Sequence, residues 1–221
     1  MVFLTEKIYS NDPLRAFKKG AEELNVFLKE AEIDAFGLYL GELKAWSKKI
    51  NLIGRKDDRE IVIKDFLDSL TISNYLPLGA SLLDIGSGAG FPGIPVKIAR
   101  NDLHVMLLEN RKKRAFFLLH IIRLLKLNDM NVSSTENDAL KHHFDFVVSR
   151  AFGSTKKIIE TGEPYLKRNG TILAMKGKNA EEELDQELPF LEKKGWRIIF
   201  LHKIKLPVIK HNRILIGLKR D

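Results

Sequence analysis

The feature that most constrains this chain is a glycine loop that follows a short apolar run. Residues 82–93 read Leu-Leu-Asp-Ile-Gly-Ser-Gly-Ala-Gly-Phe-Pro-Gly, so an acid stands just before three alternating glycines. Glycines let the backbone turn tightly after a strand and let a ligand approach it closely. A second apolar run, residues 105–108, ends at Glu109. An acid at such a strand end can accept hydrogen bonds from both hydroxyls of a ribose, so the two segments indicate a nucleotide-cofactor site.

The spacing of the glycines indicates which cofactor the loop suits. A dinucleotide-binding loop reads G-x-G-x-x-G, but Phe91 occupies the third glycine position. The order found is Asp84-x-Gly86-x-Gly88-x-Gly90, which resembles the first motif of the class I S-adenosylmethionine-dependent methyltransferases. That resemblance implies that the loop surrounds the methionine end of the cofactor, with the acid at 84 near its ammonium group and Glu109 on its ribose. The alternative is a simple turn, whose two acids are a helix cap and an ordinary strand end.

From residue 81 onwards, short apolar runs alternate with helical stretches, which is typical of a parallel sheet covered on both faces. Strands are predicted at 81–85, 104–109, 130–134, 144–149, 170–175, 196–205 and 212–219. Helices are predicted at 92–100, 111–127, 154–167 and 179–194. The last two strands are joined by a stretch too short for a crossover helix, so they should pair antiparallel. We therefore expect an α/β, Rossmann-like class I methyltransferase fold with a seven-stranded, mostly parallel sheet and an antiparallel C-terminal hairpin.

The first 80 residues lack strand alternation and read as helices. Asp12 and Pro13 form a cap-and-proline pair that should open a helix reaching about Ala31. Further helices are predicted at 35–49 and at 60–75. The second of these three helices should carry Phe36, Leu40, Leu43 and Trp46 or Ile50 on one side. Because Pro77-Leu78-Gly79 interrupts the pattern, we expect an N-terminal helical region at 1–80 and an S-adenosylmethionine-binding methyltransferase domain at 81–221.

The composition suits one α/β domain with an appendage, since the chain has 221 residues of which 44% are hydrophobic. No apolar stretch approaches the roughly 20 residues of a membrane helix, and the N-terminus lacks a signal-peptide pattern. We therefore expect a cytoplasmic protein without a membrane partner. The absence of cysteine excludes disulfides, thiol nucleophiles and cysteine-based zinc sites, and the six histidines lack metal-ligand spacing. We expect no metal and a monomer.

The net charge of +8 is unevenly distributed along the chain. Residues 1–80 carry 12 Lys and Arg against 13 Asp and Glu, whereas residues 81–221 carry 25 against 16. The basic clusters fall at 111–114, 156–157, 167–168, 176–178 and 203–213. Such clusters favour a polyanionic partner such as RNA, through phosphate contacts and counterion release. The alternative interpretation is a set of solvated helix faces and strand edges.

Several segments together resemble one family, the ribosomal RNA small-subunit methyltransferase G family, also called glucose-inhibited division protein B. Its pattern Gly-x-Gly-x-Gly-(Phe/Leu)-Pro-Gly-(Ile/Leu)-Pro is matched by residues 86–95. Further matches are Asn51-Leu52, Leu67-Asp68-Ser69, Lys113-Arg114 with Phe117-Leu118, Ser149-Arg150-Ala151 and Met175-Lys176-Gly177. Two positions depart from the pattern, because Ile53 stands where the family has Thr and Asp65 where it has His.

The resemblance implies that S-adenosylmethionine is the cofactor and that N7 of a guanine in 16S ribosomal RNA is methylated. Because N7 carries a free lone pair, no general base is needed, and catalysis should come from alignment and from a pocket suited to a positive charge that moves onto the base. The cofactor-binding positions implied by the match are Asp84, Gly86, Gly88, Gly90, Phe91, Glu109, Glu136, Asn137 and Arg150. The catalytic positions implied are Arg150, Lys176 and Asn51.

Other interpretations of these residues stay open at this point. Arg150 and Lys176 can be surface charges, and Asn51 can simply fix a turn. At the level of function, one alternative is a methyltransferase of the same fold that acts on a small molecule or a protein. The other is a basic RNA-binding assembly factor with a vestigial cofactor loop.

Overall fold

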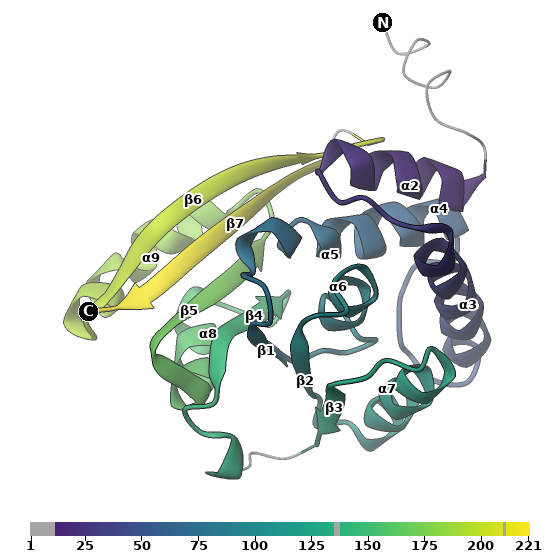
Figure 1. Cartoon of the computed structure of the whole chain (residues 1–221). Helices are drawn as coiled ribbons and strands as arrows, with labels where there is room; N and C mark the ends of the chain where they lie inside the picture. Colours follow the sequence, from purple (N-terminus) through teal and green to yellow (C-terminus); the bar gives the residue numbers. More distant parts are fainter. Residues whose placement is uncertain (1–11, 135–137, 210) are drawn as a thin grey trace, which may run out of the picture.

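The sheet of this protein has seven strands in the order β3-β2-β1-β4-β5-β7-β6. The computed structural model describes residues 12–134, 138–209 and 211–221. The strands are β1 (Ser81–Ile85), β2 (His104–Leu108), β3 (Met130–Ser133), β4 (Phe144–Arg150), β5 (Leu166–Lys176), β6 (Trp196–Leu206) and β7 (His211–Arg220). β1 to β5 are parallel, and β7 is antiparallel to both of its neighbours (Figure 1). The predicted fold class is confirmed.

Helices connect the parallel strands where the sequence predicts them. They are α6 (Gly93–Ala99), α7 (Lys112–Leu124), α8 (Thr155–Gly162) and α9 (Ala180–Lys193). The largest difference concerns α8, which was expected to continue to residue 167. A short 3-10 turn, η4 (Glu163–Tyr165), follows α8, and β5 begins at Leu166. Because Pro164 lies in that turn and has no N–H to donate, an α-helix cannot simply continue there.

The N-terminal helices begin as predicted but divide differently. α2 (Pro13–Glu23) starts at Asp12, whose side chain accepts a hydrogen bond from the Leu14 amide at 2.9 Å. It ends well before residue 31, because Asn25 adopts a left-handed φ of 58°, a conformation that asparagine tolerates better than most residues. α3 (Glu30–Ser47) therefore begins earlier than expected. The residues that α3 buries are Phe36, Tyr39, Leu40 and Leu43.

The third helical segment contains an irregularity that matters for the site. It consists of α4 (Asp58–Ile61), the π-helical turn η1 (Val62–Leu67) and α5 (Asp68–Leu70), followed by the 3-10 turn η2 (Ser73–Tyr75). π-Helical turns are rare and frequently occur at functional sites. This one carries Asp65, and Asp68 follows it at the start of α5; the two residues lie in the interior, where they are 0% and 1% exposed.

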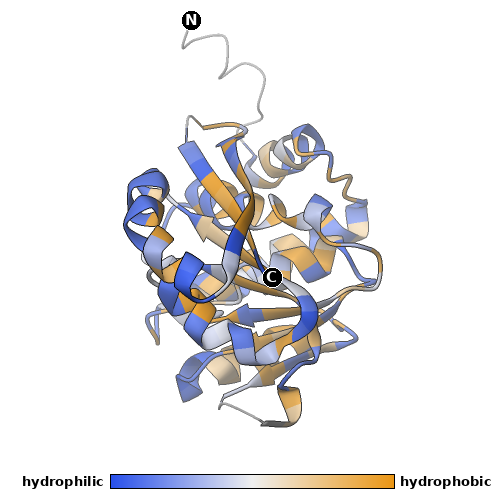
Figure 2. Cartoon of the chain, turned by 90° about the vertical axis from the view of Figure 1, so that its left-hand side faces the viewer, coloured by the Kyte–Doolittle hydropathy of each residue, from blue (hydrophilic) through white to orange (hydrophobic). Residues whose placement is uncertain are grey.

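Two hydrophobic clusters lie on the two faces of the sheet. One cluster contains residues of α2, α3, α6 and α7 together with residues of the central strands, and the other contains residues of α8 and α9. Hydrophobic residues line the inside of the molecule while polar residues cover the helices' outer faces (Figure 2). The first cluster extends from Phe17 to Leu215, so the core runs across the predicted boundary near residue 80. The two-region division stays a prediction. No helix in the described part of the chain is long and apolar enough to cross a membrane.

Candidate active site

The glycine loop lies where the strand order of the sheet reverses. β1 has β2 on one side and β4 on the other, and ligands of open α/β sheets bind at the carboxyl ends of the strands at such a point. Gly86, Gly88 and Gly90 all have left-handed φ values, of 69°, 60° and 102°. A Cβ on Gly86 would lie 2.4 Å from the ring of Phe152. A Cβ on Gly88 would have its nearest neighbouring atom at 3.8 Å. Gly88 is therefore not crowded by protein atoms, whereas Gly86 is packed against Phe152.

The N-terminal helix α3 contacts the glycine loop through a hydrogen bond. The hydroxyl of Tyr39, on α3, donates a hydrogen bond to the carbonyl oxygen of Ala89 at 2.5 Å. A Cβ on Gly90 would lie 2.8 Å from the same hydroxyl oxygen. Burial raises the pKa of Tyr39 well above its ordinary value, so the hydroxyl keeps its proton and stays a donor. The loop therefore depends on a contact 50 residues away in the sequence.

Asp84 is fully buried beneath the loop. Its Oδ2 accepts a hydrogen bond from the Gly93 amide at 2.9 Å, so it does cap the start of α6. A Cβ on Gly93 would crowd Leu107 at 2.4 Å and Oδ2 itself at 3.0 Å. Oδ1 is buried and has no hydrogen-bond partner among the described residues. Burial raises the pKa of Asp84 to about 7, and a buried acceptor of this kind favours a ligand that brings a hydrogen-bond donor or a positive charge.

Glu109, at the end of β2, ties the loop to the next helix. Its Oε2 accepts from the Gly88 amide at 2.9 Å, and its Oε1 accepts from the Arg111 amide at 2.8 Å. Arg114 approaches the same carboxylate, with Nη1 at 4.0 Å from Oε2. Because each carboxylate oxygen can accept a second hydrogen bond, these contacts leave capacity for two ribose hydroxyls. Glu109 is thus more than an ordinary strand-end acid.

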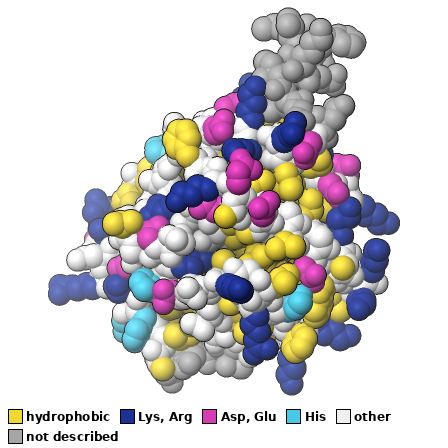
Figure 3. Space-filling model, turned by 45° about the vertical axis from the view of Figure 1, so that its right-hand side comes forward, with side chains coloured by type: hydrophobic (Ala, Val, Ile, Leu, Met, Phe, Trp, Pro, Cys, Tyr) yellow, Lys and Arg dark blue, Asp and Glu magenta, His cyan; other side chains and the backbone are white. Residues whose placement is uncertain are grey.

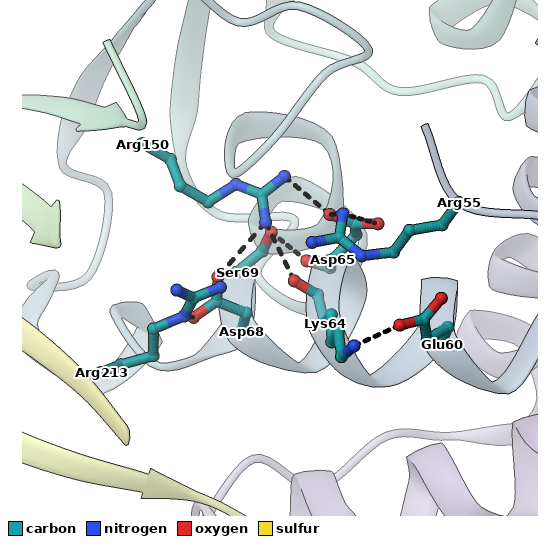
Figure 4. Close-up of polar contacts among 8 residues, drawn as sticks. All are labelled: Arg55, Glu60, Lys64, Asp65, Asp68, Ser69, Arg150 and Arg213. Atoms are coloured by element: carbon teal, nitrogen blue, oxygen red, sulfur yellow. Dashed lines mark hydrogen bonds and ion pairs between the residues drawn. The ribbon is translucent and has the colours of Figure 1, made fainter. Parts of the chain in front are cut away.

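Arg150, at the end of β4, lies in a network of charged groups (Figure 4), and its side chain is 17% exposed. Its Nη2 donates to Asp65 at 2.9 Å, and its Nη1 donates to Asp68 at 3.2 Å and to the carbonyl oxygen of Lys64 at 3.0 Å. The guanidinium also lies 4.8 Å from the ring centroid of Phe91. Burial opposes the charge of Arg150, but the two carboxylates outweigh it and raise the pKa of the guanidinium. The interpretation of Arg150 as a surface charge is wrong.

Two further arginines complete this network. Arg55 Nη1 donates to both carboxylate oxygens of Asp65, at 3.0 and 3.1 Å. Arg213 Nε, on β7, donates to Asp68 Oδ1 at 3.0 Å. Each buried carboxylate is therefore shared by two guanidinium groups. Removing one partner from such a buried arrangement leaves an uncompensated charge, which is strongly destabilising.

Lys176, at the end of β5, is also buried and paired. Its Nζ donates to the Gly153 carbonyl oxygen and to Glu183 Oε1, both at 2.5 Å. Arg150 and Lys176 line the same hollow of about 460 Å³, which we call the arginine-lined hollow. Its lining is Arg55, Asp68, Arg150, Ala151, Gly153, Met175, Lys176, Gly177, Glu183 and Arg213. The structure thus brings together two of the three predicted catalytic positions.

Asn51 does not line the arginine-lined hollow. It is exposed and lines a neighbouring hollow of about 700 Å³, which we call the basic groove. The lining of the basic groove is Lys44, Ser47, Lys48, Asn51, Ile53, Gly54, Arg55 and Lys56. The carbonyl oxygen of Asn51 accepts from Arg114 Nη2 at 3.1 Å, which connects the groove to the Glu109 carboxylate. Arg55 lines both hollows.

Comparison with known sequences decides the family. The model of a family described as rRNA small subunit methyltransferase G matches residues 32–207. A Geotalea uraniireducens protein named ribosomal RNA small subunit methyltransferase G is 40% identical over 205 residues, which cover 91% of this chain and 94% of that protein. This chain belongs to the rRNA small subunit methyltransferase G family. A relative of the same name from Syntrophus aciditrophicus is 39% identical over 201 residues, 87% of this chain and 83% of the relative.

Solved structures with lower identity share the fold of this methyltransferase G family member. M. jannaschii TYW2 in complex with AdoMet matches with a TM-score of 0.58 at 18% identity, covering 79% of this chain and 80% of that chain. A SAM dependent methyltransferase from Aquifex aeolicus matches with a TM-score of 0.55 at 19% identity, covering 74% of this chain and 94% of that chain. These likenesses confirm the Rossmann-like architecture.

Two of the predicted cofactor-binding residues lie outside the described part of the chain, and a third has a buried side chain. Glu136 and Asn137 fall outside the described residues. The ring of Phe91 is buried between Tyr39 and Phe66, with ring centroids 5.8 and 5.9 Å away. A contact of Phe91 with the cofactor therefore stays a prediction, since its side chain packs into the core.

The sequence gives no individual role to Arg55 or Asp65, and it places Arg213 only in the basic cluster at 203–213. Asp65 was noticed only as a departure from the family pattern, yet it anchors two arginines. One signal for it exists in the sequence. Asp65 and Asp68 are three residues apart within the mainly apolar stretch 61–72, and such spacing places two acids on one side of a helix.

Proposed function

We propose that this protein transfers a methyl group from S-adenosylmethionine to N7 of a guanine in 16S ribosomal RNA. The observation that carries the proposal is that the glycine loop and the arginine-lined hollow meet at one edge of the sheet. Phe152 connects them, because its ring contacts Gly86 while its neighbours Ala151 and Gly153 line the hollow. A cofactor held by the loop would therefore lie beside a pocket suited to an anionic substrate.

The residues of the loop fit the proposed cofactor. The unpartnered Oδ1 of Asp84 suits a ligand ammonium group, directly or through water, and Glu109 retains acceptor capacity for a ribose. No protein atom crowds the Cβ position of Gly88, where the nearest atom lies at 3.8 Å. When bound, S-adenosylmethionine would supply an electrophilic methyl group on a sulfonium sulfur.

The acidic residues near the hollow are suited to a reaction that needs no general base. Asp68 is held by Arg150 and Arg213, and Glu183 is held by Lys176. The oxygens of these carboxylates are thus engaged by cations, which fits a nucleophile whose lone pair is already free. The same carboxylates offset the cations of the pocket, so a base that gains positive charge during methyl transfer is repelled less.

The experiment that tests this function is mapping of N7-methylguanine in small-subunit RNA. Ribosomes from cells that lack the protein would be compared with those from cells complemented by the wild-type gene, using primer extension or mass spectrometry. The proposal predicts that a single N7-methylguanine disappears and returns on complementation. An unchanged modification pattern would contradict it. In that case, altered small-subunit assembly in the cells that lack the protein would indicate that it is an assembly factor. Normal assembly would indicate a methyltransferase that acts on a small molecule or a protein.

A further inference from the structure

The three arginines of the buried network differ in the donors that they leave free. Arg150 uses both Nη atoms on Asp65, Asp68 and a carbonyl oxygen. Arg55 donates through Nη1 alone, and Arg213 donates through Nε alone. Among the described residues, Nη2 of Arg55 and both Nη atoms of Arg213 have no hydrogen-bond partner. Arg55 and Arg213 thus each retain unused N–H groups.

The buried carboxylates fix these two guanidinium groups in advance. Asp65 and Asp68 are 0% and 1% exposed and cannot follow a moving partner, whereas the side chains of Arg55 and Arg213 are 34% and 21% exposed. Figure 4 shows Arg55 and Arg213 approaching the acids from different elements, with Arg150 between them. A planar guanidinium held on one edge by a carboxylate presents its other edge at little further entropic cost. This arrangement is a preorganised receptor for an oxyanion.

The surroundings of the two arginines favour a chain of phosphates over a single small anion. Arg55 lines both the arginine-lined hollow and the basic groove, so the two hollows adjoin at this residue. The lining of the basic groove contains four cations and no acid. Figure 3 shows Lys and Arg side chains along the margins of one face and also within it, among Asp and Glu side chains and beside hydrophobic side chains near its middle. A polyanion can therefore follow cationic groups from the groove into the hollow.

The chemistry of the proposed reaction indicates which part of the RNA these arginines contact. Arginine commonly binds guanine through O6 and N7, but a donor on N7 would occupy the lone pair that must attack the methyl group. We propose that Arg55 and Arg213 bind phosphate oxygens of the RNA strand beside the acceptor nucleotide, and that Asp65 and Asp68 are positioning residues for the two guanidinium groups. This inference rests on the proposed function, because it assumes RNA as the substrate.

The test compares Arg55→Gln and Arg213→Gln with a matched control. Affinity for small ribosomal subunits from cells lacking the protein would be titrated at several salt concentrations. Each lost phosphate contact should flatten the slope of log affinity against log salt by about 0.7–0.9, and should weaken binding on the order of tenfold. The control is Arg197→Gln, which removes one charge from an exposed pair in which Nε lies 2.9 Å from Asp221 Oδ1, away from both hollows. S-adenosylmethionine affinity should stay close to wild type in all three variants. Thermal unfolding should be unchanged in the control and shift to lower temperature in the two network variants, because Asp65 or Asp68 then keeps only Arg150 as a partner.

The variant Asp65→Asn distinguishes the orientation of Arg55 by Asp65 from the effect of net charge on RNA binding. If only the overall field mattered, removal of a negative charge would strengthen RNA binding. We expect weaker binding instead, because Arg55 loses the partner that orients it. Stronger binding by Asp65→Asn, an unaltered salt slope in both arginine variants, or an equal flattening in Arg197→Gln would each overturn the inference.

Two further comparisons keep the outcome decisive. If Arg55→Gln does not fold, Arg213→Gln carries the salt test by itself, and Arg55→Lys tests whether the planar fork is needed. Wild-type protein that fails to methylate small subunits would contradict the proposed function. Wild-type protein that methylates them, with arginine variants of unaltered salt slope, would contradict the phosphate contacts alone.

Discussion

Carboxylates organise both parts of the site, but they hold different partners. In the cofactor half, which comprises residues 84–93 and Glu109, the carboxylates accept backbone amides that lie 2, 9 and 21 residues away in the sequence. In the acceptor half, which comprises the arginine-lined hollow and Asp65, they accept guanidinium groups of residues up to 145 positions away. The first half follows from local backbone geometry, whereas the second requires separate elements to bury charge together. Mutations in the first half should therefore affect mainly cofactor affinity, whereas mutations in the second should affect folding stability as well as RNA binding.

The largest effect is expected from Asp68→Ala in the acceptor half. The substitution would remove the carboxylate shared by Arg150 and Arg213 and leave buried positive charge uncompensated. The free energy of unfolding should fall by about 3–5 kcal/mol, as measured by urea denaturation. Asp221→Ala, which breaks the exposed pair with Arg197, should cost less than about 1 kcal/mol. Similar losses in the two variants would mean that the buried network does not stabilise the fold.

In the cofactor half, Glu109→Ala should reduce ligand affinity. We expect S-adenosylmethionine binding to weaken by about 1.5–3 kcal/mol, the range for hydrogen bonds to a charged acceptor. The loop would also lose its bond to the Gly88 amide. Calorimetry measures the affinity, and the salt dependence of RNA binding should not change. A folded variant that binds the cofactor normally would remove Glu109 from the ribose site.

The cofactor half should also respond to pH through Asp84. Burial raises the pKa of Asp84 from its ordinary value of 3.8 to about 7. Between these two pH values, the carboxyl group is protonated in the folded protein without ligand but ionised in the unfolded chain. For this group, stability is greatest at low pH and falls as pH rises to about 7. A cationic ligand needs the charged carboxylate, so its affinity should rise about tenfold per pH unit below pH 7 and level off above it.

Calorimetry from pH 5.5 to 8 tests this dependence of affinity on pH. Asp84→Asn cannot titrate and should bind more weakly with a flat profile. 5′-Methylthioadenosine lacks the amino-acid group and should show little pH dependence with wild-type protein. A wild-type profile as flat as that of Asp84→Asn would show that Asp84 does not contact the ammonium group.

The smallest effect is expected from Lys176→Met. Two of the three N–H groups of Lys176 are already used by Gly153 and Glu183, so at most one remains for the RNA. We expect turnover to fall by a factor that corresponds to ~1 kcal/mol in activation free energy. The slope of log RNA affinity against log salt should change less than in Arg55→Gln. Glu183→Gln, which keeps the lysine, is the control. Unaltered turnover and salt slope in Lys176→Met would exclude Lys176 from the site.

Local patterns predicted much of this molecule. β1 was predicted at 81–85 and is found there, because its buried run ends at a glycine turn that is visible in the sequence. Asp84 and Glu109 were assigned for the same reason, since each follows from its place next to a strand end. The early end of α2 was missed, because the left-handed Asn25 stands within a stretch whose composition still suits a helix.

The order of residues along the chain was enough to predict the sheet, the glycine loop and the position of Asp84 and Glu109 at strand ends. Spacing over a few residues decides these, since strand ends and tight turns depend on neighbouring backbone. Only the tertiary structure decided that Arg55, Asp65, Arg150 and Arg213 form one network, and that Asn51 lies in a separate groove. A charged residue looks the same in the sequence whether it faces water or a buried partner. Its energetic role depends on burial and on partners that the chain brings together only when the helices pack against the sheet.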